Sequence, residues 1–323
     1  MTKLIVAVVT AMTFSILPAG AQTYPSRPIT IIVPFAAGGP TDALARVLGE
    51  RMRQSLQQTI LVENITGAGG TIGVARAVRA APDGYTVSIG HLGTHVINGA
   101  IYPLPFDLVN DLAPVALIAS NPMMIVSKND VPAKNLKELI TWIKANNGRV
   151  SAGTAGVGSA AHFSGVYLEQ LIDVKLQFVP YRGTAPALQD LLGGQIDLMV
   201  DQAANSLAQV QAGKIRAYGI TADKRLPAAP NVPTVDEAGL PGFYVSLWSG
   251  LWVPKATPKE IIAKLNAAVV EALADPAVQK RFADVGLEVP PLDKQTPEAL
   301  AAHQQAEVKK WWPMIKAANI TVN

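Results

Sequence analysis

Hydrophobic and polar positions alternate with two different spacings along this chain. Short β-branched runs at 29–33 and 58–64 predict buried strands, and each is followed by a longer segment with helical periodicity. In the segment 41–56, the apolar residues that recur every three or four positions are Leu44, Val47, Leu48, Met52 and Leu56. Strands that alternate with helices predict an α/β fold with parallel sheets and right-handed crossovers.

The same alternation begins again in the second third of the chain, so the pattern predicts two domains. Two further helices near the C-terminus do not belong obviously to the second set. We therefore expect residues 22–122 and 246–323 to form domain 1 and residues 123–245 to form domain 2. The two crossings between them would make a hinge. Ligands of open α/β sheets bind beyond the carboxyl ends of the strands, which here predicts a cleft between the domains.

The first 21 residues have the pattern of a secretory signal peptide. Lys3 precedes an uncharged apolar run over 4–17, and small residues precede a predicted cut after Ala21. The 14 residues of this run would span only about 21 Å as a helix, less than the ~30 Å hydrocarbon core of a membrane. The chain has no cysteine, which fits export to the bacterial periplasm and excludes thiol catalysis and Cys-ligated zinc.

Charge and spacing exclude several partners. Removal of the signal peptide takes Lys3 away and lowers the formal net charge from +3 to +2, so nucleic acid is not an expected partner. No metal is expected, because His91 and His95 follow a strand, flank Gly93 and lack a third ligand. No cofactor is expected, because the glycines of 67–73 lack dinucleotide-binding spacing and favour close packing of a helix on its sheet.

The stretch VPFAAGGPTD, residues 33–42, joins the first predicted strand to the first predicted helix. It lacks the lysine of a phosphate-binding loop, which excludes a nucleoside triphosphate. Backbone N–H groups and the start of a helix can still hold an anion. The residues that offer such groups or caps are Ala37, Gly38, Gly39, Thr41 and Asp42. A turn without a ligand is the alternative.

The stretch GTAGVGSAAH, residues 153–162, repeats this arrangement in the second half. Its candidate ligand contacts are Thr154, Val157, Gly158, Ser159 and Ala160. One anion-binding loop in each domain predicts a ligand that bridges the domains and carries a carboxylate. Ser159 and His162 lie three residues apart on one helix without an orienting third group, and the chain has no Gly-x-Ser-x-Gly elbow, so we do not expect an enzyme.

Further candidates lie near strand ends or near a crossing between the domains. Arg182, Asp201 and Trp248 each have an alternative interpretation. Thr94 offers a hydroxyl to a ligand. Tyr181 and Arg182 could reach the cleft, where Arg182 either pairs with a carboxylate or lies in solvent. Asp201 either accepts a hydrogen bond from a hydroxyl, ammonium or protonated carboxyl group of the ligand or caps the next helix. Trp248 either walls the pocket or packs in the core.

Seven stretches in order, across essentially the whole mature chain, resemble the substrate-binding proteins of tripartite tricarboxylate transporters, also called the Bug (Bordetella uptake gene) family. They are YPSRPITIIVPFAAGGPTDALAR, VENITGAGGTIGVARAVRAAPDGYT, THVINGAIYPLPFDLVNDLAPV, SAGTAGVGSAAHFSGVYLEQ, VPYRGTAPALQDLLGGQIDLMVD, QAGKIRAYGIT and WPMIKAANITVN. One departure is Thr66, where family members usually have proline.

The resemblance implies two Rossmann-like domains that close like a flytrap, as in type II periplasmic binding proteins. It implies that the loops Phe35–Asp42 and Thr154–Ser159 hold one carboxylate of the ligand and that Tyr181 and Asp201 flank its other end. It also implies delivery of the ligand to a membrane permease of one large and one small subunit. We expect the receptor itself to be a monomer.

The ligand class stays open at this point. Family ligands include di- and tricarboxylates, acidic amino acids and aromatic acids such as terephthalate. Neutral Ala37, Val157 and Ala160 favour a mono- or dicarboxylate over citrate, whereas an aromatic acid would suit a slot walled by Phe35 or Trp248. The alternatives from other classes are a secreted hydrolase or isomerase that acts on a small carboxylate, and a ligand sensor for a signalling partner.

Overall fold

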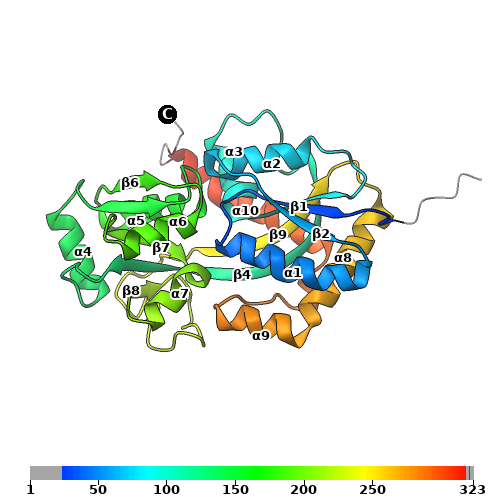
Figure 1. Cartoon of the computed structure of the whole chain (residues 1–323). Coiled ribbons are helices and arrows are strands. Elements are labelled where there is room, and N and C mark those ends of the chain that lie inside the picture. The colour runs from blue at the N-terminus through cyan, green and yellow to red at the C-terminus, as the bar shows by residue number, and fades with distance from the viewer. Residues whose placement is uncertain (1–23, 318–319, 321–323) are drawn as a thin grey trace, which may run out of the picture.

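The computed structural model describes residues 24–317 and residue 320. The predicted signal peptide and its cleavage site lie outside these residues. The described chain has the predicted α/β class, with a nine-stranded sheet and helices packed around both ends of it (Figure 1). No helix within the described ranges is long and apolar enough to cross a membrane.

One end of the sheet, with the helices around it, is called the first lobe here. Its strands are β1 (Ile29–Val33), β2 (Ile60–Asn64), β3 (Thr86–His91), β9 (Ser246–Pro254) and the first part of β4 (Leu112–Lys128). Its helices are α1 (Pro40–Leu56), α2 (Thr71–Val78), α3 (Asn98–Ile101), α8 (Lys259–Ala274), α9 (Pro276–Asp284) and α10 (Pro297–Ala317), with short helical turns at Ala68–Gly70, Gly93–Ile97 and Leu292–Lys294.

The other end forms the second lobe. Its strands are β5 (Ser151–Thr154), β6 (Gln177–Pro180), β7 (Leu198–Gln202), β8 (Ile215–Ile220) and the last part of β4. Its helices are α4 (Leu136–Ala145), α5 (Ala160–Ile172), α6 (Thr184–Leu192) and α7 (Ala203–Gln211). In Figure 1 the second lobe is mainly green, and the first lobe carries the blue and the orange-to-red parts of the chain.

The prediction of parallel pairing is right for some strands and wrong for others. β1 pairs in parallel with β2 and β3, and β5 pairs in parallel with β6 and β7. By contrast, β4 and β9 are antiparallel to each other and to their neighbours, and β8 is antiparallel to β4. The chain passes from the first lobe to the second along β4 and returns along β9, so these two strands must run in opposite directions.

β4 and β9 connect the lobes (Figure 1). β4 pairs with β9 up to Pro122 and with β7 and β8 from Met123 onward. The hydroxyl of Thr221 joins both crossing segments, because it accepts from Met123 N–H at 2.9 Å and donates to Val245 O at 2.7 Å. These contacts motivate a hinge at this level, and the domain division given above remains a prediction.

The loop that leads into α1, residues 35–42, is called the first loop here, and the loop that leads into α5, residues 154–159, is called the second loop. The apolar stripe of α1 explains how the first loop is anchored. Leu44, Leu48, Met52 and Leu56 are buried against the sheet as predicted, whereas Val47 is only partly buried at the edge of the stripe. Pro40 occupies the first turn, where its missing N–H costs no helical hydrogen bond. The packed helix therefore fixes the position of its own N-terminus at the carboxyl end of β1.

Candidate functional site

The N-termini of α1 and α5 meet at one small cavity between the lobes, which we call the inner cavity. Its volume is about 10 Å³, which is roughly the space of one water molecule. The first lobe lines it with Phe35, Gly39, Pro40, Thr41 and His91. The second lobe lines it with Ala155, Ser159, Ala160, Ala161, Thr184 and Gln202. The two predicted anion-binding loops therefore face each other across this cavity.

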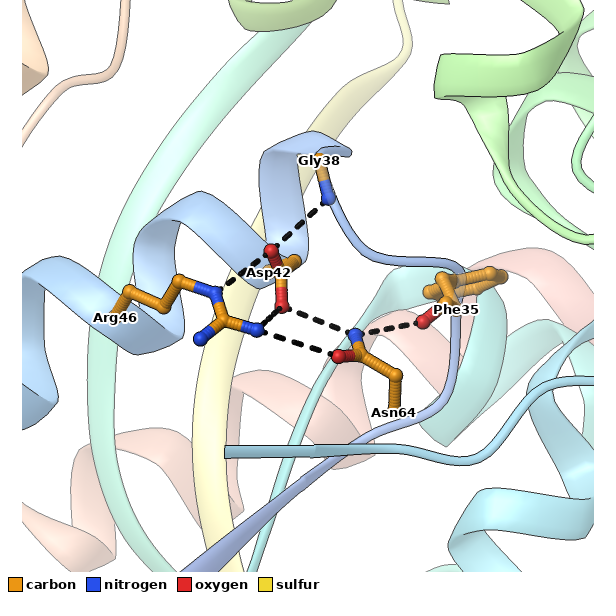
Figure 2. A network of polar contacts seen from close by, with 5 residues as sticks. All are labelled: Phe35, Gly38, Asp42, Arg46 and Asn64. Carbon is orange, nitrogen blue, oxygen red and sulfur yellow. Dashed lines mark hydrogen bonds and ion pairs between the residues drawn. The ribbon is translucent and has the colours of Figure 1, made fainter. Parts of the chain in front are cut away.

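The side chain of Asp42 stabilises the first loop through hydrogen bonds (Figure 2). Its carboxylate accepts hydrogen bonds from Gly38 N–H at 3.0 Å, from Arg46 at 2.9 Å and from Asn64 Nδ2 at 3.0 Å, and the same Asn64 nitrogen donates to Phe35 O at 2.9 Å. Burial alone would raise the pKa of Asp42, but these hydrogen bonds outweigh it and hold the pKa below its ordinary value. Asp42 thus shapes the loop and does not line the cavity.

The second loop is a tight turn that requires glycine. Gly156 and Gly158 have φ values of +101° and +77°, in the region that favours glycine. A Cβ on Gly158 would lie 2.5 Å from Asn98 Oδ1 and 2.7 Å from Tyr102 Cε2. The turn leads directly into Ser159, which caps α5 by accepting from His162 N–H at 3.3 Å.

The electrostatics of the inner cavity favour an anion. Two helix N-termini contribute partial positive charge and unpaired N–H groups. Burial lowers the pKa of His91 to about 4, so its ring is neutral at physiological pH. None of the described residues that line this cavity is acidic, and Thr41, Ser159, Thr184 and Gln202 offer polar side chains. The arrangement suits a carboxylate group, which two oriented dipoles and several donors can bind together.

A larger outer cavity of about 760 Å³ adjoins the inner one and shares Phe35 and Ala155 with it. Most of its lining is apolar or glycine: Phe35, Ala36, Gly67, Ala68, Gly69, Gly70, Ala155, Gly156, Val157, Pro180 and Pro186. The remaining lining residues are Tyr102, Tyr181 and Arg182. Tyr181 donates its hydroxyl to Asp190 Oδ2 at 2.6 Å, and Arg182 is exposed. The outer cavity can hold the body of a small organic molecule.

The predicted site residues fall into three groups. Those that line a cavity are Phe35, Gly39, Thr41, Val157, Ser159, Ala160, Tyr181 and Arg182. Those that shape the loops without lining a cavity are Ala37, Gly38, Asp42, Thr154 and Gly158. Those that belong to neither loop and line neither cavity are Thr94, Asp201 and Trp248.

The third group makes contacts within its own lobe. The Thr94 hydroxyl accepts from His91 N–H at 3.0 Å. The ring of Trp248 packs in the hydrophobic core, and its indole N–H donates to the partly buried Glu307 at 3.2 Å. Asp201 is fully buried and accepts from the side chains of Asn205 and Ser206 on α7. Burial raises the pKa of Asp201 to about 6, although these hydrogen bonds oppose the shift.

Several lining residues are absent from the sequence-based prediction. Thr184 and Gln202 lie where α6 begins and where β7 ends, and the general rule that sites follow strand ends indicates these regions without selecting the residues. The segment Gly67–Gly70 borders the outer cavity as well as packing α2 on its sheet. Its positive φ values at Gly67, Gly69 and Gly70 permit this close approach of the backbone to the cavity.

The chain matches the family model described as "Tripartite tricarboxylate transporter family receptor" over residues 44–320. The chain belongs to this family. Of the solved structures similar to this receptor, the periplasmic binding protein BugD is 43% identical with a TM-score of 0.89, covering 93% of this chain and 100% of BugD.

Two other similar structures carry ligands. MatC from Rhodopseudomonas palustris with bound malate is 42% identical with a TM-score of 0.88, and the match covers 90% of this chain and 100% of MatC. The R. palustris protein Rpa4515 with adipate is 31% identical with a TM-score of 0.87, and the match covers 93% of this chain and 100% of that protein. The receptor described here therefore has the two-domain fold of periplasmic binding proteins.

Proposed function

We propose that this receptor captures a small carboxylate in the periplasm and delivers it to a tripartite membrane permease with one large and one small subunit. The observation that carries the proposal is the convergence of the α1 and α5 N-termini on one cavity whose described lining has no acidic side chain. The similar structures with malate and adipate support the ligand class. The proposal includes export of the protein with cleavage of a signal peptide after Ala21. It also includes a monomeric receptor.

One carboxylate oxygen of the ligand would occupy the one-water space of the inner cavity, and the rest of the carboxylate would lie where this cavity adjoins the outer one, beside Phe35 and Ala155. The hydroxyls of Thr41, Ser159 and Thr184 and the amide of Gln202 would donate to it, directly or through ordered water. The helix termini add attraction that bulk salt screens little, because the cavity is enclosed. A neutral group could accept these hydrogen bonds but would gain neither their charge-assisted strength nor the attraction of the helix termini, so it should bind more weakly.

The body of the ligand would lie in the outer cavity against Phe35, Ala36 and Val157. Arg182 is the charged residue that lines this cavity, so a second carboxylate at the far end of the ligand would face it. Asp201 and Trp248 have no part in this proposal, because neither lines a cavity. The geometry thus favours a dicarboxylate with an apolar middle over an amino acid that needs an acidic partner for its ammonium group.

A thermal-shift screen of the mature protein tests the carboxylate proposal. The probes are succinate, L-malate, adipate, terephthalate and L-aspartate, with succinamide as a matched compound that lacks both charges. A ligand at 100 times its Kd stabilises the folded state by about 2.7 kcal/mol, so dicarboxylates should raise Tm and succinamide should not. Equal shifts with succinamide, or no shift with any acid, would contradict the proposal.

Thr184→Val tests the position of the bound carboxylate. Loss of the hydroxyl that faces the inner cavity should lower affinity for the best probe about tenfold. Thr141→Val is the matched control, because its hydroxyl donates to Lys137 O on the exposed surface of α4. Equal affinities of the two variants would place the carboxylate elsewhere.

A further inference from the structure

Tyr102 makes a hydrogen bond from one lobe to the other. It follows α3 in the first lobe, and its hydroxyl donates to Val157 O in the turn before α5 of the second lobe, at 2.6 Å. Its ring lines the outer cavity. A second bond, from Ala36 N–H to Arg182 O at 3.0 Å, also joins the lobes at residues that line this cavity. These two bonds join the lobes beside the outer cavity, and this bonded arrangement is called the closed form here.

The carbonyl of Val157 is enclosed by the first lobe. A Cβ on Gly69 would lie only 2.2 Å from Val157 O and 3.3 Å from the Tyr102 hydroxyl, so the glycine backbone closes against this carbonyl. A carbonyl enclosed in this way needs a donor, because an unsatisfied buried acceptor is costly. In the closed form Tyr102 supplies that donor.

The orientation of Val157 affects the start of α5. The next residue, Gly158, directs its N–H toward His162 Nδ1 at 3.4 Å, and Ser159 then caps the helix. Because the peptide between Val157 and Gly158 is planar, a carbonyl held by Tyr102 also fixes the direction of the Gly158 N–H. The first turn of α5, which borders the inner cavity, is thereby held in place from the opposite lobe.

We propose that Tyr102 is a positioning residue for ligand capture: its hydroxyl closes on Val157 O in the ligand-holding form and keeps the α5 terminus over the bound group. The inference rests on the function proposed above. In an open form both groups would hydrogen-bond to water, so the bond favours closure without being needed for folding. A residue that stabilises only the closed form acts mainly on the rate of ligand release.

Tyr102→Phe removes the hydroxyl and keeps the ring that walls the cavity. We expect affinity for a bound probe to fall about tenfold, because the enclosed carbonyl loses its donor. The bond between Ala36 and Arg182 remains, so closure is weakened and not abolished. The fall should appear in the dissociation rate, with the association rate changed less than about twofold.

Tyr24→Phe is the matched control. The Tyr24 hydroxyl also donates to a backbone carbonyl, that of Gly84 at 2.8 Å, but this bond lies within the first lobe. Both variants and the wild type are measured by surface plasmon resonance with succinate, L-malate and adipate. Equal dissociation rates for Tyr102→Phe and the wild type, or an equal loss in Tyr24→Phe, would overturn the proposal.

A second readout separates this proposal from the carboxylate function. The sequence has no cysteine, so Arg79→Cys in the first lobe and Gln189→Cys in the second provide one clean spin-label pair. Failure of the wild type to bind any of the three acids would contradict the carboxylate function. The inter-label distances of the unliganded protein would then decide on Tyr102: a smaller closed population in Tyr102→Phe supports the proposal, and identical populations overturn it.

Discussion

The carboxylate of Asp42 accepts the N–H of Gly38, four residues earlier, at 3.0 Å. This bond folds the first loop back on the helix that follows it, and Arg46 and Asn64 hold the other lone pairs of the same carboxylate. The side chain of Asp42 is 5% exposed. A single acid therefore sets the shape of a loop that borders the ligand cavity.

Asp42→Ala should weaken both stability and ligand binding. Removal of one acceptor from three donors should lower the free energy of unfolding by about 1–3 kcal/mol. Affinity for the best probe should fall about tenfold, because the loop loses its fixed shape. Urea unfolding and calorimetric titration measure the two effects.

Glu50→Ala is the control for Asp42→Ala. Glu50 lies on the same helix and pairs with Arg53, but both side chains are more than half exposed, so its loss should be almost neutral. If Asp42→Ala binds ligand as well as Glu50→Ala does, Asp42 has no role in shaping the site.

Gly158→Ala should abolish tight binding, and Gly148→Ala should not. The two glycines have φ values of +77° and +76°, so alanine brings the same backbone strain of about 1 kcal/mol at each. A Cβ at Gly148 meets nothing within 4 Å, whereas a Cβ at Gly158 collides with Asn98 and Tyr102. The difference between the variants, measured by titration after circular dichroism confirms folding, isolates the contact between the lobes. Equal affinities would contradict the closed arrangement of the second loop.

Asp201→Asn should stabilise the protein at neutral pH. Burial raises the pKa of Asp201 to about 6, so the folded state binds a proton more readily than the unfolded state. The charged form is therefore disfavoured above pH 6, and the wild type should gain stability as pH falls from about 6 to 4. The gain from Asn should be about 3 kcal/mol at pH 7.5 and less than about 1 kcal/mol at pH 4. A gain that does not change with pH would show that Asp201 is not destabilised by its charge.

Acid should destabilise the receptor through its histidines. Burial lowers the pKa of His91 and His162 to about 4 and that of His95 to about 3. The unfolded chain binds protons near pH 6.5, so stability from these groups is complete above that pH and is lost as pH falls toward 4. Each histidine should cost roughly 2 kcal/mol at pH 5. These losses outweigh the opposite contribution of Asp201, so Tm should fall between pH 7 and pH 5, and a flat profile would contradict the burial of the rings.

The fold class and the two facing loops could be predicted from local patterns. The stripe from Leu44 to Leu56 and the glycines at Gly38 and Gly158 carry signals that depend only on neighbouring residues. The direction of β4 and β9 could not be predicted in this way, because it depends on how the chain returns between lobes.

Local sequence patterns also do not predict which side chains near the loops or at strand ends face the cavity. Asp201 and Trp248 occupy suitable positions, but their side chains point into contacts with α7 and α10. Thr184 and Gln202 reach the cavity from a helix start and a strand end that carry no glycine-rich signature. Which of two neighbouring residues faces a cavity depends on strand register, and Gln202 rather than Asp201 faces it here.

The hydroxyl of Thr221 bonds to the backbone of both crossing segments at once. Met123 and Val245 are therefore coupled, and we expect the two connections between the lobes to move together. Under that restraint the two glycine-rich loops would approach or separate as a pair. In the function proposed above, a ligand that contacts one loop alone would gain little from closure, so binding would favour molecules that contact both loops at the same time.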